Sequence, residues 1–154
     1  MSRVASAANI MGVDIDQLNA QLATIVSVTR EAPESIGTAL KTVYARMSDI
    51  QAGLDQDTTL SEYTAEMHQM GINVLDATGN LRDMGDVVEE IGGKWETLIR
   101  NQQVSLAQTI AGTRQYSRMM ALFDNWDMYE KAKETSADSL GTLEKQNETY
   151  KESL

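Results

Sequence analysis

Apolar side chains recur at intervals of three and four residues along most of the chain, and this spacing constrains the fold more than any other feature. Side chains at these intervals share one face of an α-helix. Only one proline, Pro33, interrupts the pattern, and its place suits the first turn of a helix. The sequence therefore predicts an all-α protein, a bundle of several short helices. The first clear helical face consists of Ile15, Leu18, Leu22, Ile25 and Val26.

Capping residues predict where several helices begin. Asp14–Gln17 and Thr59–Glu62 both match the capping box, in which the first side chain accepts a bond from the fourth residue's backbone and the fourth side chain bonds back. Asp83 and Asn101 are expected to cap two later helices. Pro33 disfavours the helical conformation of the preceding residue, so the first of these helices should end near Thr29–Glu31.

The spacing of apolar residues changes between two of the predicted helices. Ile72, Asn73 and Val74 alternate in polarity, and residues 76–80 have the composition of a turn. This pattern predicts one small β-hairpin near residues 72–82. Because an isolated hairpin is marginal in water, it should lie on the helices.

Glycine and tryptophan mark the helix that follows the predicted hairpin. The pair Gly92-Gly93 is expected to weaken or kink this helix, at a cost of about 1 kcal/mol for each glycine relative to alanine. Trp95 should anchor the core just after the kink. Gly112 is expected to end or bend the next helix.

The composition bounds the classes of partner. Lys and Arg total 13 against 23 Asp and Glu, a net charge of −10. Such a balance argues against nonspecific nucleic-acid binding and against docking on an anionic membrane. No apolar stretch approaches the roughly 20 residues of a membrane span. With 9 Met and only 5% aromatic residues, we expect an aliphatic, Met-rich core, although Met-rich faces can also accept a partner helix.

The domain organisation follows from a change in composition near residue 130. Residues 1–129 are predicted to form a compact helical domain. Residues 130–154 are rich in Lys and Glu, and Leu140 and Leu143 give them little apolar support. We therefore expect an exposed helix or linker there, continuing into the rest of a longer protein.

Residue types that carry catalysis or bind metals are scarce. Cys is absent and His68 is the single His, so a zinc site would need three or more carboxylates, which zinc seldom uses. Ser61 or Ser105 could join His68 in a Ser-His-Asp triad only formally, because no Gly-x-Ser-x-Gly nucleophile turn is present. We expect His68 to be an ordinary surface or core residue.

Two acidic features also fail as chemical sites. Counted as a calcium loop from Asp76, Gly79 falls at position 4 and Val87 at position 12, where the EF-hand needs glycine at 6 and a carboxylate at 12. Glu89 and Glu90 lie on adjacent faces of a helix, which predicts a solvated pair rather than an acid/base dyad. We therefore predict no catalytic, cofactor-binding or metal-binding residue, no cofactor and no enzymatic activity.

Five phrases of sequence follow one another in order from about Ala8 to about Trp126. They resemble the core region of phage tail tape measure proteins, and their order and spacing carry the resemblance. The phrases are Ala8-x-x-Met11-Gly12-Val13; Gly37-Thr38-Ala39-Leu40-Lys41-Thr42-Val43-x-x-Arg46-Met47-Ser48; Gly71-Ile72-x-Val74-x-Asp76-x-x-Gly79-x-Leu81-Arg82; Lys94-Trp95-x-x-Leu98; and Gln102-Gln103-x-x-Leu106-Ala107-x-x-Ile110-Ala111-Gly112-x-Arg114-Gln115.

The resemblance implies a structural, non-enzymatic segment of a phage or prophage tail protein. Such proteins help to set tail length, lie in the lumen of the tail tube and leave it when the genome is ejected. Implied partners are tail-tube, baseplate or tail-assembly chaperone proteins, or further copies of the chain, met first in the host cytoplasm during assembly. Two alternatives stay open. One is a free-standing acidic helical adaptor or effector that binds a host protein, and the other is a small hydrolase or metal enzyme that depends on His68.

Overall fold

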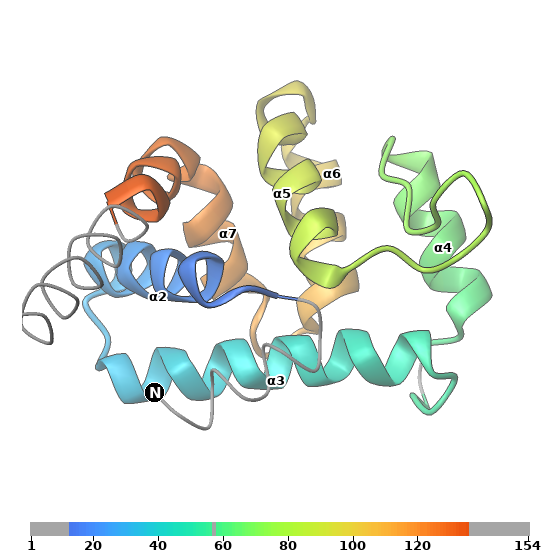
Figure 1. The fold of residues 1–154 in the computed structure, drawn as a ribbon, viewed down its shortest axis with the longest axis horizontal. Helices are drawn as coiled ribbons and strands as arrows, with labels where there is room; N and C mark the ends of the chain where they lie inside the picture. The colour runs from blue at the N-terminus through green and yellow to red at the C-terminus, as the bar shows by residue number, and fades with distance from the viewer. Residues whose placement is uncertain (1–12, 57, 136–154) are drawn as a thin grey trace, which may run out of the picture.

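The computed structural model describes residues 13–56 and 58–135. The prediction of an all-α fold is confirmed, since these residues form helices and no strand. The part of the predicted exposed helix or linker that lies beyond residue 135 is outside the described residues. The helices, shown in Figure 1, are α2 (Ile15–Thr29), α3 (Pro33–Gln51), α4 (Leu60–Gln69), α5 (Met84–Lys94), the 3-10 turn η1 (Trp95–Thr97), α6 (Arg100–Ala111), α7 (Tyr116–Asp124) and a last helix over residues 126–135.

The long helix α3 lies along one side of the molecule, and the other labelled helices all lie on the same side of it (Figure 1). Helix α2 packs on the N-terminal half of α3 and also contacts α7. Helix α6 packs against the middle of α3 and α4 lies at its C-terminal end. This arrangement buries the apolar face that the spacing predicted on each helix, because each face meets a neighbouring helix.

Two of the predicted caps have full capping-box geometry. The Gln17 backbone N–H donates to Asp14 Oδ1 at 2.8 Å, and the Asp14 N–H donates to Gln17 Oε1 at 3.2 Å. At the start of α4, the Glu62 N–H donates to Thr59 Oγ1 at 3.1 Å and the Thr59 N–H to Glu62 Oε2 at 3.5 Å. Pro33 begins α3, as predicted.

Two other helix starts differ from the prediction. Asp83 does precede α5, but its side chain makes no capping bond. Helix α6 begins at Arg100 instead of after Asn101, and the Gln102 side chain accepts a bond from the Ile99 N–H at 3.2 Å. The side chain of Gln102, three residues after the cap residue Ile99, thus binds back to the cap, and Asn101 lies inside the helix.

Four aromatic rings form a column through the half of the core that contains α5, α7 and the last helix. We call Trp95, Phe123, Trp126 and Tyr129 the aromatic column. Successive ring centroids lie 4.8, 5.8 and 4.2 Å apart, within the range of favourable ring contacts. Trp95 is 2% exposed and its Nε1 donates to Asp124 Oδ1 at 2.8 Å, which confirms its predicted role as a core anchor.

The aromatic column explains the first of the two adjacent glycines in α5, which runs without a break through both. A β-carbon at Gly92 would lie 2.2 Å from the Trp126 ring, whereas one at Gly93 would meet nothing within 4 Å. Helix α5 is not interrupted at either glycine, and the expected weakening stays a prediction. Gly92 allows the Trp126 ring to approach the helix backbone, and that close approach is the reason that no side chain fits there.

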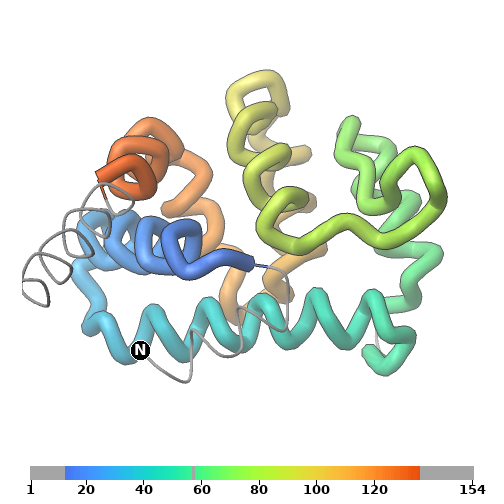
Figure 2. The backbone as a smooth tube through the Cα atoms, in the orientation of Figure 1, coloured from blue at the N-terminus to red at the C-terminus, as the bar shows by residue number. Residues whose placement is uncertain are grey.

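The predicted β-hairpin near residues 72–82 is also wrong, because the described residues contain no strand. A single antiparallel bridge joins Leu75 and Leu81, and Figure 2 shows the segment doubling back between α4 and α5. The alternation is real, since Ile72 and Val74 are buried between exposed neighbours. It extends over too few residues to build a ladder, and side chains described below bind the remaining backbone groups.

The methionines belong mainly to the core, the interpretation that the sequence favoured. Those buried are Met47, Met67, Met84, Met119 and Met120. None of the described helices is both long and apolar enough to cross a membrane.

Candidate functional site

The loop between α4 and α5, residues 70–83, is the largest described segment without helix, and polar side chains of the loop and of α5 bind its backbone groups. Ile72 and Val74 hold it to the core, so the intervening residues face outward. Loops fixed on a rigid scaffold are common sites of binding, because their backbone is free to present side chains. This loop and the two helices beside it are therefore the first place to look for function.

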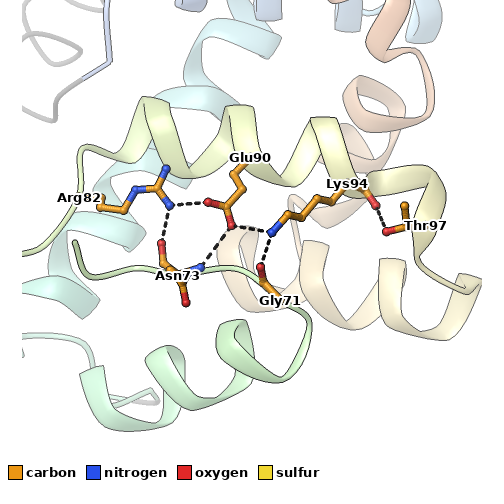
Figure 3. A network of polar contacts seen from close by, with 6 residues as sticks. All are labelled: Gly71, Asn73, Arg82, Glu90, Lys94 and Thr97. Carbon is orange, nitrogen blue, oxygen red and sulfur yellow. Dashed lines mark hydrogen bonds and ion pairs between the residues drawn. The ribbon is translucent and has the colours of Figure 1, made fainter. Parts of the chain in front are cut away.

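Glu90 of α5 holds both sides of this loop (Figure 3). Its Oε1 accepts a bond from Arg82 Nη1 at 2.6 Å, and its Oε2 accepts bonds from the Asn73 N–H at 3.3 Å and from Lys94 Nζ at 3.4 Å. The two cations also reach the loop backbone, since Arg82 Nη1 donates to the Asn73 carbonyl at 2.7 Å and Lys94 Nζ to the Gly71 carbonyl at 2.6 Å. We call these five residues the Glu90 latch.

The latch depends on charge. Partial burial acts to raise the pKa of Glu90, but the bonds from Arg82 and the Asn73 N–H and the charge of Lys94 outweigh it and hold that pKa below its ordinary value. Glu90 is therefore ionised at neutral pH. Its carboxylate takes the role that a partner strand would play in a hairpin, because it satisfies the backbone of Asn73.

The tip of the loop is a turn built on Asp76. Its Oδ1 accepts bonds from the Thr78 Oγ1 at 2.6 Å, the Thr78 N–H at 2.9 Å and the Asn80 N–H at 3.0 Å. The Thr78 hydroxyl, followed by the backbone bonds, lowers the pKa of Asp76. This is the side-chain turn typical of Asp, and the carboxylate is used within the turn itself.

The neighbouring acid, Glu89, points to the opposite side of α5. Its Oε1 accepts bonds from Tyr129 Oη at 2.6 Å, Lys133 Nζ at 2.8 Å and Gln17 Nε2 at 3.2 Å. Burial, together with the bond to Glu89 and its charge, raises the pKa of Tyr129. Glu89 and Glu90 share no proton, but the prediction of a solvated pair is wrong, because each is half-buried in its own network.

His68 lies on the exposed face of α4 and forms part of an open groove. The groove is predominantly apolar and is lined by α4 and by one loop residue, namely Leu60, Ser61, Thr64, Ala65, His68 and Leu75. Within the described ranges 13–56 and 58–135, no cluster of three His, Asp or Glu side chains has the arrangement of a metal site. No sequence pattern indicates this groove, since its two sides lie on segments with different patterns.

The described structure defines a class of protein: a helical module with a packed core and a loop fixed to its surface by polar side chains. Residues 1–112 match the family described as phage-related minor tail protein. The chain belongs to this family, and the resemblance to a phage tail protein is thereby confirmed. Membership supports a structural role in the phage tail, in contact with other tail proteins. No solved structure matches the chain.

Proposed function

We propose that this chain is a non-enzymatic assembly module of a tail tape measure protein. In this role it helps to set tail length from within the tail tube and leaves the tube at genome ejection. The observation that carries the proposal is the family match, which covers residues 1–112 and so includes four of the five tape measure phrases and part of the fifth. The helical fold agrees with it, because tape measure proteins are expected to be helical.

The packing of the helices indicates what kind of module it is. A ruler needs extended helices, in which length grows by about 1.5 Å per residue. Here the helices fold back on α3, and α2, α4 and α6 all contact it. Most of these residues therefore add no length along one axis. A compact module of this kind is suited to docking or anchoring within the tail, rather than to measuring its length.

A deletion distinguishes a segment that measures tail length from one that anchors the protein in the tail. Removing residues 13–135 from the tail gene shortens a fully helical ruler by about 180 Å at about 1.5 Å per residue. If the segment is an anchor, tails instead fail to form or vary widely in length. Electron microscopy of the particles measures both outcomes.

A point variant is the matched control because it leaves the number of residues unchanged. Trp95→Ala removes the 2% exposed anchor of the core and should unfold the module in part. If the segment is an anchor, this variant should disrupt tail assembly. If the segment is a ruler, tail length should stay the same. If deletion and point variant both leave tail length, tail initiation and genome ejection unchanged, the proposal is wrong and the adaptor alternative gains support.

A further inference from the structure

The net charge of the chain is concentrated in one part of the sequence. Residues 47–93 contain ten Asp or Glu and a single Arg, so they carry −9 of the total charge of −10. In the structure this part forms the end of α3, the whole of α4, the loop and most of α5. The rest of the chain is close to neutral, so most of the net negative charge lies at one end of the molecule.

Much of this charge is not neutralised within the molecule. Six carboxylates of the region are exposed and form no ion pair with a cation of the described residues, whereas Glu89 and Glu90 are paired. Unpaired carboxylates around a low-dielectric surface produce a negative potential that attracts basic partners. The six are Asp49, Glu62, Glu66, Asp76, Asp83 and Asp86.

The same end of the molecule exposes apolar side chains. Leu75 and Leu81, joined by the bridge, are 39% and 40% exposed. Leu75 also lines the apolar groove on α4, whose other walls include Leu60 and Ala65. Ser61, Ala65 and His68 on this face of α4 are exposed.

We propose that this surface, the groove of α4 with Leu75 and Leu81, binds a basic amphipathic helix of another tail protein. The apolar face of such a helix would fill the groove between α4 and the loop, and its Lys or Arg residues would be attracted by the negative charge of this end of the molecule. The Glu90 latch holds the loop in position, so the wall of the groove is present before the partner arrives. The assignment rests on the proposed role in tail assembly for the identity of the partner.

Charge argues against a second copy as the occupant. Two copies meeting through this surface would bring two regions of net charge −9 together, and like charges at an interface oppose association. A partner with the opposite charge removes that cost. Binding should therefore weaken as the salt concentration rises, because salt screens exposed charges over about 10 Å at 0.1 M.

The test uses the 154-residue chain and a synthetic helical peptide with a Leu face and a Lys face. Methyl NMR locates binding and a titration gives the affinity. Two exposed-site variants alter the groove independently: Ala65→Arg fills it with a bulky cation and Leu75→Asp places a charge on its wall. Val28→Asp is the matched control, because Val28 is 38% exposed on α2, outside the groove. Circular dichroism checks that each variant is folded.

The expected result is saturable binding that shifts the methyl signals of Ala65, Leu75 and Leu81. Both groove variants should weaken it by about tenfold, the effect of about 1.4 kcal/mol, and Val28→Asp should not. The inference is overturned if the peptide fails to bind or binds elsewhere. It is equally overturned if a Lys/Ser peptide without apolar residues binds as well, or if light scattering shows a dimer that Ala65→Arg dissociates. These outcomes concern the groove alone, whereas tail length tests the proposed function.

Discussion

Helix α5 joins two regions that are stabilised by different physics. On one side Gly92 lies against the Trp126 ring of the aromatic column, and on the other Glu90 holds the loop through the latch. The column is made of three buried rings and the partly buried ring of Trp126, so it should respond to changes in volume and little to pH or salt. The latch is made of partly exposed charges, so it should respond to pH and salt and little to volume.

The difference shows that one short helix, α5, both packs in the core and positions the loop at the surface. Packed rings fix α5 relative to α7 and the last helix. The fixed helix then gives Glu90 a defined position from which to hold a loop that has little core of its own. The variants below test whether the two regions are as separate as this comparison holds.

The largest effect is expected from Trp95→Ala. Trp95 is fully enclosed and contacts Phe123 at 4.8 Å between centroids, and losing such a side chain costs about 3–5 kcal/mol of unfolding free energy. Urea unfolding at neutral pH measures the loss. Trp95→Phe keeps a ring but loses the bond to Asp124, so it should cost clearly less. A loss below about 1 kcal/mol for Trp95→Ala would show that the column does not anchor this half of the core.

The next largest change in stability is expected at Gly92, and the adjacent Gly93 should respond in the opposite direction. Gly92→Ala places a β-carbon against the Trp126 ring and should cost about 1–3 kcal/mol through overpacking. Gly93→Ala meets open space in the same helix and should stabilise the protein by up to about 1 kcal/mol through helix propensity. Thermal unfolding of the matched pair measures the contrast. Equal effects of the two variants would contradict the role assigned to Gly92.

The sequence predicted features that depend on neighbours in the chain. Both capping boxes link residues three apart, and the apolar faces repeat every three or four residues, so local pattern was enough to place Asp14, Thr59 and most helix ends. Gly112, which follows α6 with φ of 80°, is another local case. Trp95 was recognised as an anchor because a large ring on an apolar face has few other uses.

The features that the sequence missed depend on distant partners. Glu89 is bound by Tyr129, 40 residues away, and no local spacing indicates that pair. Gly92 looked like a helix breaker because the Trp126 ring that requires it lies on another helix. The hairpin prediction failed because Glu90, 17 residues beyond Asn73, supplies an acceptor that a second strand would otherwise provide.

Glu90→Gln tests the latch through pH. The substitution keeps the shape but removes the charge, and it should cost about 1 kcal/mol at pH 7, since the site is partly exposed and screened. The pKa of Glu90 is lower in the folded protein than its ordinary value of 4.5. Its contribution is therefore complete above about pH 4.5 and is lost as the pH falls through the folded value. Urea unfolding between pH 7 and pH 3 should decline less steeply in the variant.

Glu96→Gln is the control for this measurement, because Glu96 is exposed in η1, which directly follows α5, and forms no ion pair with the described residues. Its pH profile should match that of the unaltered protein. If Glu90→Gln also leaves the profile unchanged, the latch does not depend on charge, and the proposed contrast with the column is lost.

The smallest effect on stability is expected from Asp76→Ala, at the tip of the loop. Asp76 is fully exposed, and its Oδ1 binds only groups of the same turn, Thr78 and Asn80. The variant should leave the midpoint of urea unfolding unchanged, because no packed residue loses a contact. Amide exchange of Thr78 and Asn80 should nevertheless become faster, since both N–H groups lose their acceptor. Asp76→Asn keeps an oxygen acceptor and should slow this exchange again. If Asp76→Ala instead lowered the midpoint as much as Glu90→Gln does, the loop tip and the latch would unfold together with the core, and the loop could not act as a separately held wall of the groove.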